Sequence, residues 1–211
     1  LDLTDQVAAS LIDPSQRFQD KDNYDWIVNA KSNNLVVGTK ARILYQDAYG
    51  RLRIALAFNN LVRLKKTGPI MLGRDHHDTG GTDSPFRETA NIKDGSNIMA
   101  DMATHVALGN ASRGMSLVSL HNGGGVGIGK AINGGYGMVL DGSIKVDEIL
   151  KSALTYDVMA GVARRSWARN ENAIETIKHF NSLGNDHHVT EPFVANKKLL
   201  DEILKNGGLK K

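Results

Sequence analysis

Residues 69–81, PIMLGRDHHDTGG, form the stretch that decides the fold of this chain. A short apolar run ends at Leu72, and a polar cluster and a glycine pair follow at once. An apolar run bounded by turn residues predicts a buried strand, and the glycines predict a loop after it. A second stretch of the same design, MSLVSLHNGGGVG, occupies residues 115–127. Because loops at strand ends carry polar groups on a rigid frame, we expect these two loops to form the functional site.

Helical patterns surround these two strands. The clearest runs from Tyr49 to Lys65, where apolar residues recur at intervals of three and four. It ends at Gly68-Pro69, and a helix followed by a strand and a polar glycine loop is typical of α/β folds. Residues 35–37 and 41–45 predict a pair of strands or one strand interrupted at Gly38, and residues 137–142 predict a further strand that ends in a turn. Further helices are predicted at 4–12, within 15–34, and at 96–110, 143–156, 158–169, 171–183 and 195–205.

The order of these elements predicts the α/β fold class. We expect a core over residues 1–142, with a short, mostly parallel sheet flanked by helices, and a helical C-terminal region over residues 143–211 packed on that core. The sequence shows no repeat and no low-complexity tract. Four aromatic residues at helical positions are expected in the core, namely Trp26, Phe58, Trp167 and Phe180.

The composition is that of a soluble folded protein. Of the 211 residues, 41% are hydrophobic and 23% charged, and the net charge of +3 gives little support to a nucleic-acid partner. The absence of cysteine excludes disulfides, zinc-thiolate sites and iron–sulfur clusters and fits a reducing cytoplasm. No apolar run is long enough to cross a bilayer, and the first residues lack the layout of a signal peptide. We therefore expect a cytoplasmic protein with no membrane partner.

The polar cluster at residues 74–78 places two carboxylates, two imidazoles and a guanidinium side by side in the sequence. A carboxylate such as Asp75 or Asp78 can orient and charge a histidine such as His76, which then transfers a proton near neutral pH. Aspartate and histidine are also metal ligands, but no second motif of metal-binding spacing accompanies them. A solvated turn held by a salt bridge is the third interpretation.

Two further segments are suited to binding an anion. Arg87, in the loop SPFRET at residues 84–89, fits either a bidentate anion clamp or a surface ion pair. His121-Asn122-Gly123-Gly124-Gly125 predicts a nest of backbone N–H groups beside a polar pair, which suits a phosphate, a carboxylate or an oxyanion. A tight crossover explains the same glycine run, whose spacings do not form a convincing dinucleotide-binding fingerprint.

The chain resembles the urocanase family at these motifs. The similar region runs from residue 68 to residue 140 and includes GRDHHD at 73–78, SPFRET at 84–89, KDGS at 93–96 and VSLHNGGGVG at 118–127. The helical segment ALAFNNLVR at 55–63 is similar too. The resemblance implies a urocanase-like core, and it implies the C-terminal portion of a divergent, longer-type member of that family.

The sequence departs from the family pattern at two points. Leu44, within Arg42-Ile43-Leu44-Tyr45, stands where the family has a cysteine near its cofactor. The family also has an inserted NAD-binding Rossmann domain and N-terminal residues that hold cofactor and substrate, and we find no complete Rossmann domain in this sequence. Since the chain also starts at Leu1, inside a helical pattern, we expect a fragment of a longer protein.

The resemblance implies part of a urocanate hydratase, which adds water to urocanate to give 4-imidazolone-5-propionate in histidine degradation. In that family NAD+ acts as an electrophile and not as a redox carrier. The resemblance further implies proton handling and imidazole orientation by Asp75, His76 and Asp78, and anion anchoring by Arg87. The implied NAD+ site comprises His121, Asn122, Gly123, Gly124 and Gly125, with no metal. The implied partners are urocanate, the remainder of the urocanase chain and a second copy in a homodimer.

Other functional classes remain open on the sequence. We expect the 211 residues alone to be inactive, but a stand-alone module that binds an anion or a nucleotide, or a scaffold without catalysis, is the competing interpretation. The cluster at residues 74–78 also leaves a metal-dependent hydrolase open. Separate binding measurements with NAD+ and urocanate, together with metal analysis, distinguish these classes.

Overall fold

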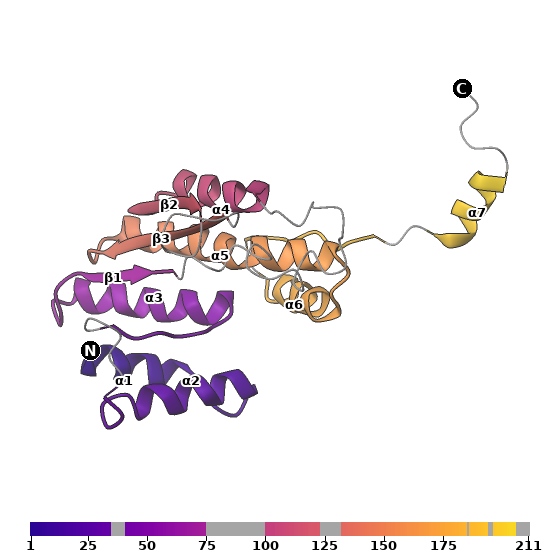
Figure 1. The fold of residues 1–211 in the computed structure, drawn as a ribbon. Coiled ribbons are helices and arrows are strands. Elements are labelled where there is room, and N and C mark those ends of the chain that lie inside the picture. The colour runs from indigo at the N-terminus through magenta and orange to yellow at the C-terminus, as the bar shows by residue number, and fades with distance from the viewer. Residues whose placement is uncertain (35–40, 75–99, 123–131, 185, 194–195, 206–211) are drawn as a thin grey trace. The chain divides into compact units, whose positions relative to one another are not determined.

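The computed structural model describes residues 1–34, 41–74, 100–122, 132–184, 186–193 and 196–205. They belong to two compact units, Leu1–Gly161 and Val162–Lys211, each of which is described by itself. The predicted division after residue 142 stays a prediction. Figure 1 shows the elements, which are α1 (Asp2–Leu11), α2 (Phe18–Val28), α3 (Ala48–Arg63), β1 (Ile70–Gly73), α4 (Ala100–Ser112), β2 (Leu117–Asn122), β3 (Ile132–Leu140), α5 (Ile144–Trp167), α6 (Glu171–Ser182) and α7 (Lys197–Lys205).

The sheet of the first unit has three strands in the order β1-β3-β2. Both β1 and β2 pair with β3 in antiparallel register, so the mixed helix-and-sheet class is confirmed but the predicted mostly parallel sheet is wrong. The reason is that β3 runs back between the two predicted strands, which share a direction but are not neighbours. Two strands on opposite sides of a shared neighbour lie two strand spacings, roughly 9.6 Å, apart, which is too far for hydrogen bonds between them.

Strand β3 begins inside the glycine run, earlier than the sequence predicts. Gly134, Gly135 and Gly137 are strand residues, although a run rich in glycine favours a loop. At Gly137 an added Cβ would lie 3.0 Å from Met71 Cε and 3.4 Å from the Cβ of Leu117. Side chains of both neighbouring strands therefore occupy the space above this glycine.

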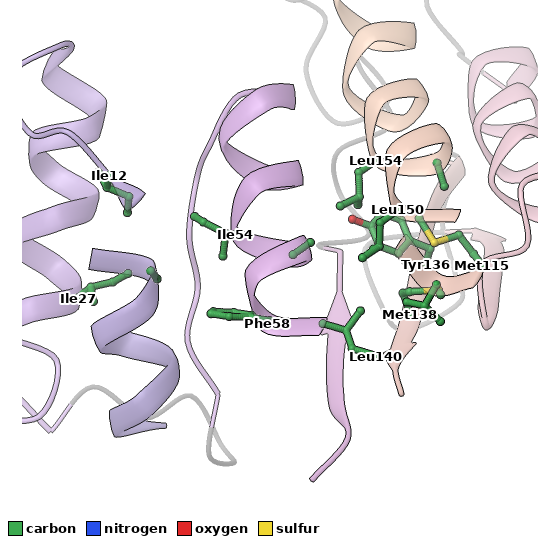
Figure 2. Packing of buried hydrophobic residues seen from close by; sticks show 14 residues of the cluster. Ile12, Ile27, Ile54, Phe58, Met115, Tyr136, Met138, Leu140, Leu150 and Leu154 are labelled. Atoms are coloured by element: carbon green, nitrogen blue, oxygen red, sulfur yellow. The ribbon is translucent and has the colours of Figure 1, made fainter. Parts of the chain in front are cut away.

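The core lies on one face of β3. Its alternating residues Tyr136, Met138 and Leu140 are buried, and they form one hydrophobic cluster with Leu150 and Leu154 of α5. Figure 2 shows Tyr136 and Met138 close to Leu150, with α3 between this group and the N-terminal helices. Complete burial of side chains such as Leu140 and Leu150 contributes about 1.5–3 kcal/mol each.

Helix α3 has packing partners on both sides. It contacts α1, β1 and β3. In Figure 2 buried Ile54 lies on the side of α3 that faces Ile12 and Ile27. Its start is fixed by Asp47, whose Oδ1 accepts the N–H of Gly50 at 2.7 Å and caps the helix. Because α3 contacts both α1 and the sheet, it lies between the helical pair α1 and α2 and the strands.

The strand predicted at residues 41–45 is absent, since the described residues there are irregular. Asn23 of α2 provides the physical reason. Its Oδ1 accepts the N–H of Tyr45 at 3.1 Å, and its Nδ2 donates to the carbonyl oxygen of Tyr45. A side chain therefore satisfies the backbone groups that a strand neighbour would otherwise satisfy. The strand predicted at 35–37 lies outside the described residues.

Helix α5 is one continuous helix, so the two helices predicted at 143–156 and 158–169 are wrong in number. Asp157, at the predicted break, lies inside it, because tertiary contacts outweigh the low helix propensity of aspartate. In the second unit, α6 is capped by Asn170 Oδ1, which accepts the N–H of Ala173 at 3.0 Å.

The aromatic residues predicted in the core divide into two pairs. Phe58 and Phe180 are buried, as expected. Trp26 and Trp167 are 46% and 52% exposed, so their placement in the core is wrong. Both tryptophans have a helical position but lie off the buried stripe, and helical spacing alone does not tell those positions apart.

Candidate functional site

Most of the predicted site residues lie outside the part of the chain that the structure describes. Asp75, His76, Asp78 and Arg87 fall within residues 75–99, and Gly123, Gly124 and Gly125 fall within residues 123–131. The described residues that lead into these segments are Arg74, directly after β1, and His121 and Asn122, the last two residues of β2. The assignments of the undescribed residues stay predictions.

The two strands that lead into the predicted loops enter them at different levels of the sheet. Gly73, the last residue of β1, and Leu117, the first residue of β2, both pair with Gly137. Strand β2 then continues until Asn122 pairs with Ile132. At about 3.3 Å per residue, its end lies roughly 17 Å beyond the level of Gly73. The strands therefore share a sheet and a direction, but their ends are staggered and separated by β3.

Arg74 is the described residue of the polar cluster that follows β1. Its backbone N–H donates to the carbonyl oxygen of Tyr136 at 3.0 Å, which extends the pairing of β1 with β3 by one residue. Its guanidinium Nη1 pairs with Oδ1 of Asp157 on α5. The two side chains are 8% and 0% exposed. The salt bridge of Arg74 is therefore buried and reaches Asp157 on a helix far away in the sequence. A solvated turn would instead have an exposed salt bridge within the turn itself.

Asp157 has two further neighbours from other helices. Asn110 of α4 donates through Nδ2 to Asp157 Oδ1 at 3.0 Å. Arg51 of α3 places Nη1 4.0 Å from Asp157 Oδ2, while its Nε donates to the carbonyl oxygen of Gln46 at 2.7 Å. We refer to Arg51, Arg74, Asn110, Tyr136 and Asp157 together as the Asp157 cluster. Helices α3, α4 and α5 meet the sheet there.

The phenol of Tyr136 has a raised pKa in this cluster. Burial, followed by the negative charge of Asp157, raises the pKa of its phenol from 10.0 to about 12, although Arg51 and Arg74 act in the opposite direction. The phenol is therefore neutral at physiological pH. Since Asp157 is fully buried and Tyr136 stays protonated, the cluster is suited to holding groups in place, and we assign it no proton transfer.

From the raised pKa of Tyr136 we expect the free energy of unfolding to fall at alkaline pH. An unfolded chain ionises Tyr136 near pH 10.0 and the folded chain only near 12, so the folded state loses stability as the pH rises through this interval. At 1.36 kcal/mol per pKa unit, the loss approaches about 2–3 kcal/mol. Denaturant unfolding of wild type and Tyr136→Phe measures it: their difference should be constant below pH 10 and shift in favour of the variant above it. A difference that does not change with pH contradicts the assignment.

Sequence reasoning did not identify Asp157, Asn110 or Tyr136 as members of a site. A signal for Asp157 is present, because it is the single charged residue in the segment LTYDVMAGV at 154–162. A lone carboxylate within an apolar helical stretch indicates a buried partner. The identity of that partner is not visible, since Arg74 lies in another element far away in the sequence.

Comparison with known proteins identifies the family. A model of the urocanase C-terminal domain matches residues 1–179. The chain belongs to the urocanase family. It is 47% identical to a probable urocanate hydratase of Caenorhabditis elegans, 45% to the urocanate hydratase of Mus musculus and 44% to that of Homo sapiens.

These urocanase relatives are much longer than this chain. The similarity covers 96–97% of the chain but 32% of each relative, so the chain spans about a third of their length. All three strands and the whole Asp157 cluster lie inside the residues matched by the urocanase model, whereas α7 lies outside them.

Two features are absent from the parts of the urocanase chain that the structure describes. Within those ranges, no three histidine, aspartate or glutamate side chains gather as a metal site. None of the helices placed there has the length and apolar character needed to cross a membrane.

Proposed function

We propose that this chain is the C-terminal part of a urocanate hydratase, a hydro-lyase that adds water to urocanate to give 4-imidazolone-5-propionate in histidine degradation. The observation that carries the proposal is the identity of 44–47% to proteins named urocanate hydratase or probable urocanate hydratase over nearly the whole chain. Since the chain spans 32% of those proteins, the activity is proposed for the full-length protein and not for the 211 residues alone.

The proposed cofactor is NAD+, which supplies an electrophilic nicotinamide ring when bound. We propose that His121, Asn122, Gly123, Gly124 and Gly125 hold part of it. This donor set fits a dinucleotide chemically, because an imidazole, an amide and glycine N–H groups can all donate to phosphate or carboxamide oxygens. His121 and Asn122 are held at the end of strand β2, and His121 is half-buried. The remaining contacts are proposed to come from the rest of the urocanase chain.

The proposed reaction needs groups that move protons and groups that orient the substrate. We propose that Asp75 and Asp78, together with His76, orient the substrate imidazole and handle its protons. Arg87 is proposed to anchor an anionic group, such as the urocanate carboxylate. This proposal is supported by the position of Arg74, which directly precedes Asp75 and is held in the buried Asp157 cluster.

The proposal includes the partners of the full-length protein. These are urocanate as the small-molecule substrate, the remainder of the urocanase chain, and a second copy in a cytoplasmic homodimer. No nucleic acid, membrane or metal takes part in the proposed reaction. Leu44, at the position of the family's cysteine, implies that the reaction proceeds without a thiol at this position.

Urocanate turnover and ligand binding test the proposed function together. We expect the full-length protein to consume urocanate, measured by the loss of its ultraviolet absorbance. Calorimetry of the 211-residue chain with NAD+ and with urocanate should show no binding of either ligand. Absence of turnover in the full-length protein contradicts the proposal. Binding of NAD+ by the chain alone favours the competing stand-alone nucleotide-binding module.

A further inference from the structure

Helix α5 carries two aspartates that are each held by an arginine and an asparagine. Near its start, Asp147 accepts a hydrogen bond from Arg63 Nη2 and another from Asn59 Nδ2, the latter at 2.6 Å. Further along, Asp157 has the same two kinds of partner in Arg74 and Asn110. We call these two groups the Asp147 triad and the Asp157 triad. Because they have the same chemistry, any difference in their roles must come from the parts of the chain that each triad joins.

The Asp147 triad is a structural cross-link between helix α3 and the turn before α5. Asn59 Oδ1 accepts the N–H of Gly142, and Arg63 Nε donates to the carbonyl oxygen of Gly142, each at 2.8 Å. The side chains of its ion pair, Arg63 and Asp147, are 33% and 17% exposed. These contacts join α3 either to α5 or to the turn before it, so this triad stabilises the packing of α3 against the start of α5.

The Asp157 triad is buried more deeply and connects a different place. Burying an ion pair costs desolvation free energy that the attraction between the charges often fails to repay, so stability alone is a weak reason for such a pair. Its arginine does not lie on a helix. Arg74 directly follows strand β1 and directly precedes Asp75, the first carboxylate of the polar cluster at residues 74–78.

Arg74 is fixed at both its main chain and its side chain. The backbone is held by the bond to the carbonyl oxygen of Tyr136, and the guanidinium is held by Asp157. Asn110 of α4 donates to the same carboxylate oxygen of Asp157 and so fixes the position of the acceptor. Since consecutive Cα atoms are about 3.8 Å apart, a residue fixed in this way sets the starting point of the chain that follows it.

We propose that Asp157 is a positioning residue for the proposed hydration, acting through Arg74 to fix the point at which strand β1 leads into Asp75. This inference rests on the proposed function. Asp157 touches no substrate, because its carboxylate is fully buried, and it acts by keeping one guanidinium in one place. A displacement of about 1 Å at reacting groups can cost about 100-fold in rate, so weakening this contact lowers kcat.

The test compares Asp157→Asn with Asp147→Asn in the full-length protein. Both exchanges are nearly isosteric. Both aspartates lie on α5, and each exchange removes a negative charge that pairs with an arginine. We expect kcat for urocanate to fall by about 10- to 100-fold in Asp157→Asn, with a smaller change in KM. Asp147→Asn should keep the wild-type kcat while its melting temperature falls. An equal kcat in the two variants overturns the inference, because a purely structural role predicts that result.

Arg74→Lys is the second variant and keeps the inference testable if Asp157→Asn does not fold. It keeps the positive charge but loses the planar fork that pairs with a carboxylate. We expect a lower kcat, and a double variant with Asp157→Asn no slower than the slower single variant, because both act through one contact. A wild-type kcat in Arg74→Lys, or losses that multiply in the double variant, overturns the inference. Absence of urocanate turnover in the wild-type protein contradicts the proposed function instead.

Discussion

Replacing Gly142 with alanine is expected to lower the free energy of unfolding by about 3 kcal/mol or more. Gly142 lies in the turn between β3 and α5 and has a φ of +86°, in the left-handed region that favours glycine. An added Cβ would also lie 2.7 Å from the backbone nitrogen of Arg63 and 2.9 Å from its Cα. Because these atoms belong to the backbone of α3, no side-chain rotation relieves the clash, and the turn has to separate from the helix.

Two other glycines provide matched controls for this substitution. Gly114 has nearly the same φ, +85°, but its added Cβ would meet only the end of the Ile149 side chain at 3.3 Å. Gly114→Ala should therefore cost only the backbone strain, about 1–2 kcal/mol. Gly68→Ala, with nothing within 4 Å of its Cβ, should stay within about 0.5 kcal/mol of wild type. Denaturant unfolding of the three variants measures this order, and an equal cost at Gly142 and Gly114 would remove the clash from the explanation.

The turn at Gly142 also shows what the sequence could and could not predict. An apolar run followed by Asp141-Gly142-Ser143 predicts the end of a strand and a turn, and the structure confirms both. The partner of this turn is Asn59, a fully buried residue of α3 that donates to Ser143 O and accepts from Gly142 N. Local pattern specifies the turn because its backbone demands glycine, whereas the partner depends on how distant elements pack.

Three of the wrong predictions share a physical cause, which is contact with distant parts of the chain. At Tyr45 the side chain of Asn23 takes the hydrogen bonds expected of a strand neighbour. At Asp157 the partners Arg74 and Asn110 keep a helix continuous where the sequence indicates a break. The predicted mostly parallel sheet is wrong because β3 lies between β1 and β2 and pairs with both in antiparallel register. In each case a residue far away in the sequence outweighs the local preference.

The candidate site could likewise be predicted only in part, because short motifs are visible in the sequence and contacts between distant residues are not. The resemblance at the two polar motifs identifies the family, and the comparisons confirm it. The Asp157 cluster depends on contacts among α3, α4, α5 and the sheet, which no short motif contains. The motifs thus indicate the family, and the packing of the first unit supplies the groups that hold Arg74 in place.

Asp78→Asn in the full-length protein is expected to lower kcat for urocanate by about 10²- to 10⁴-fold, the usual range for removal of an acid-base group. Asparagine has almost the same shape as aspartate but cannot exchange a proton near neutral pH or orient a charged imidazole through a full negative charge. Steady-state kinetics over a range of pH measures the effect. The expected result is a lower kcat together with the loss of one limb of its pH profile.

A second exchange of aspartate for asparagine separates chemistry from charge and folding in this experiment. Asp22 is an exposed residue of α2, so Asp22→Asn removes the same charge far along the sequence from the polar cluster and should keep the wild-type kcat. Asp22→Asn should unfold within about 0.5 kcal/mol of wild type, because Asp22 is a surface residue. Denaturant unfolding of both variants separates a loss of kcat from a loss of folded protein. Turnover by Asp78→Asn at the wild-type rate would exclude Asp78 as the acid-base group and leave Asp75 with His76 to carry the proton transfer. A loss of kcat confined to Asp78→Asn, with unchanged stability, assigns that step to its carboxylate.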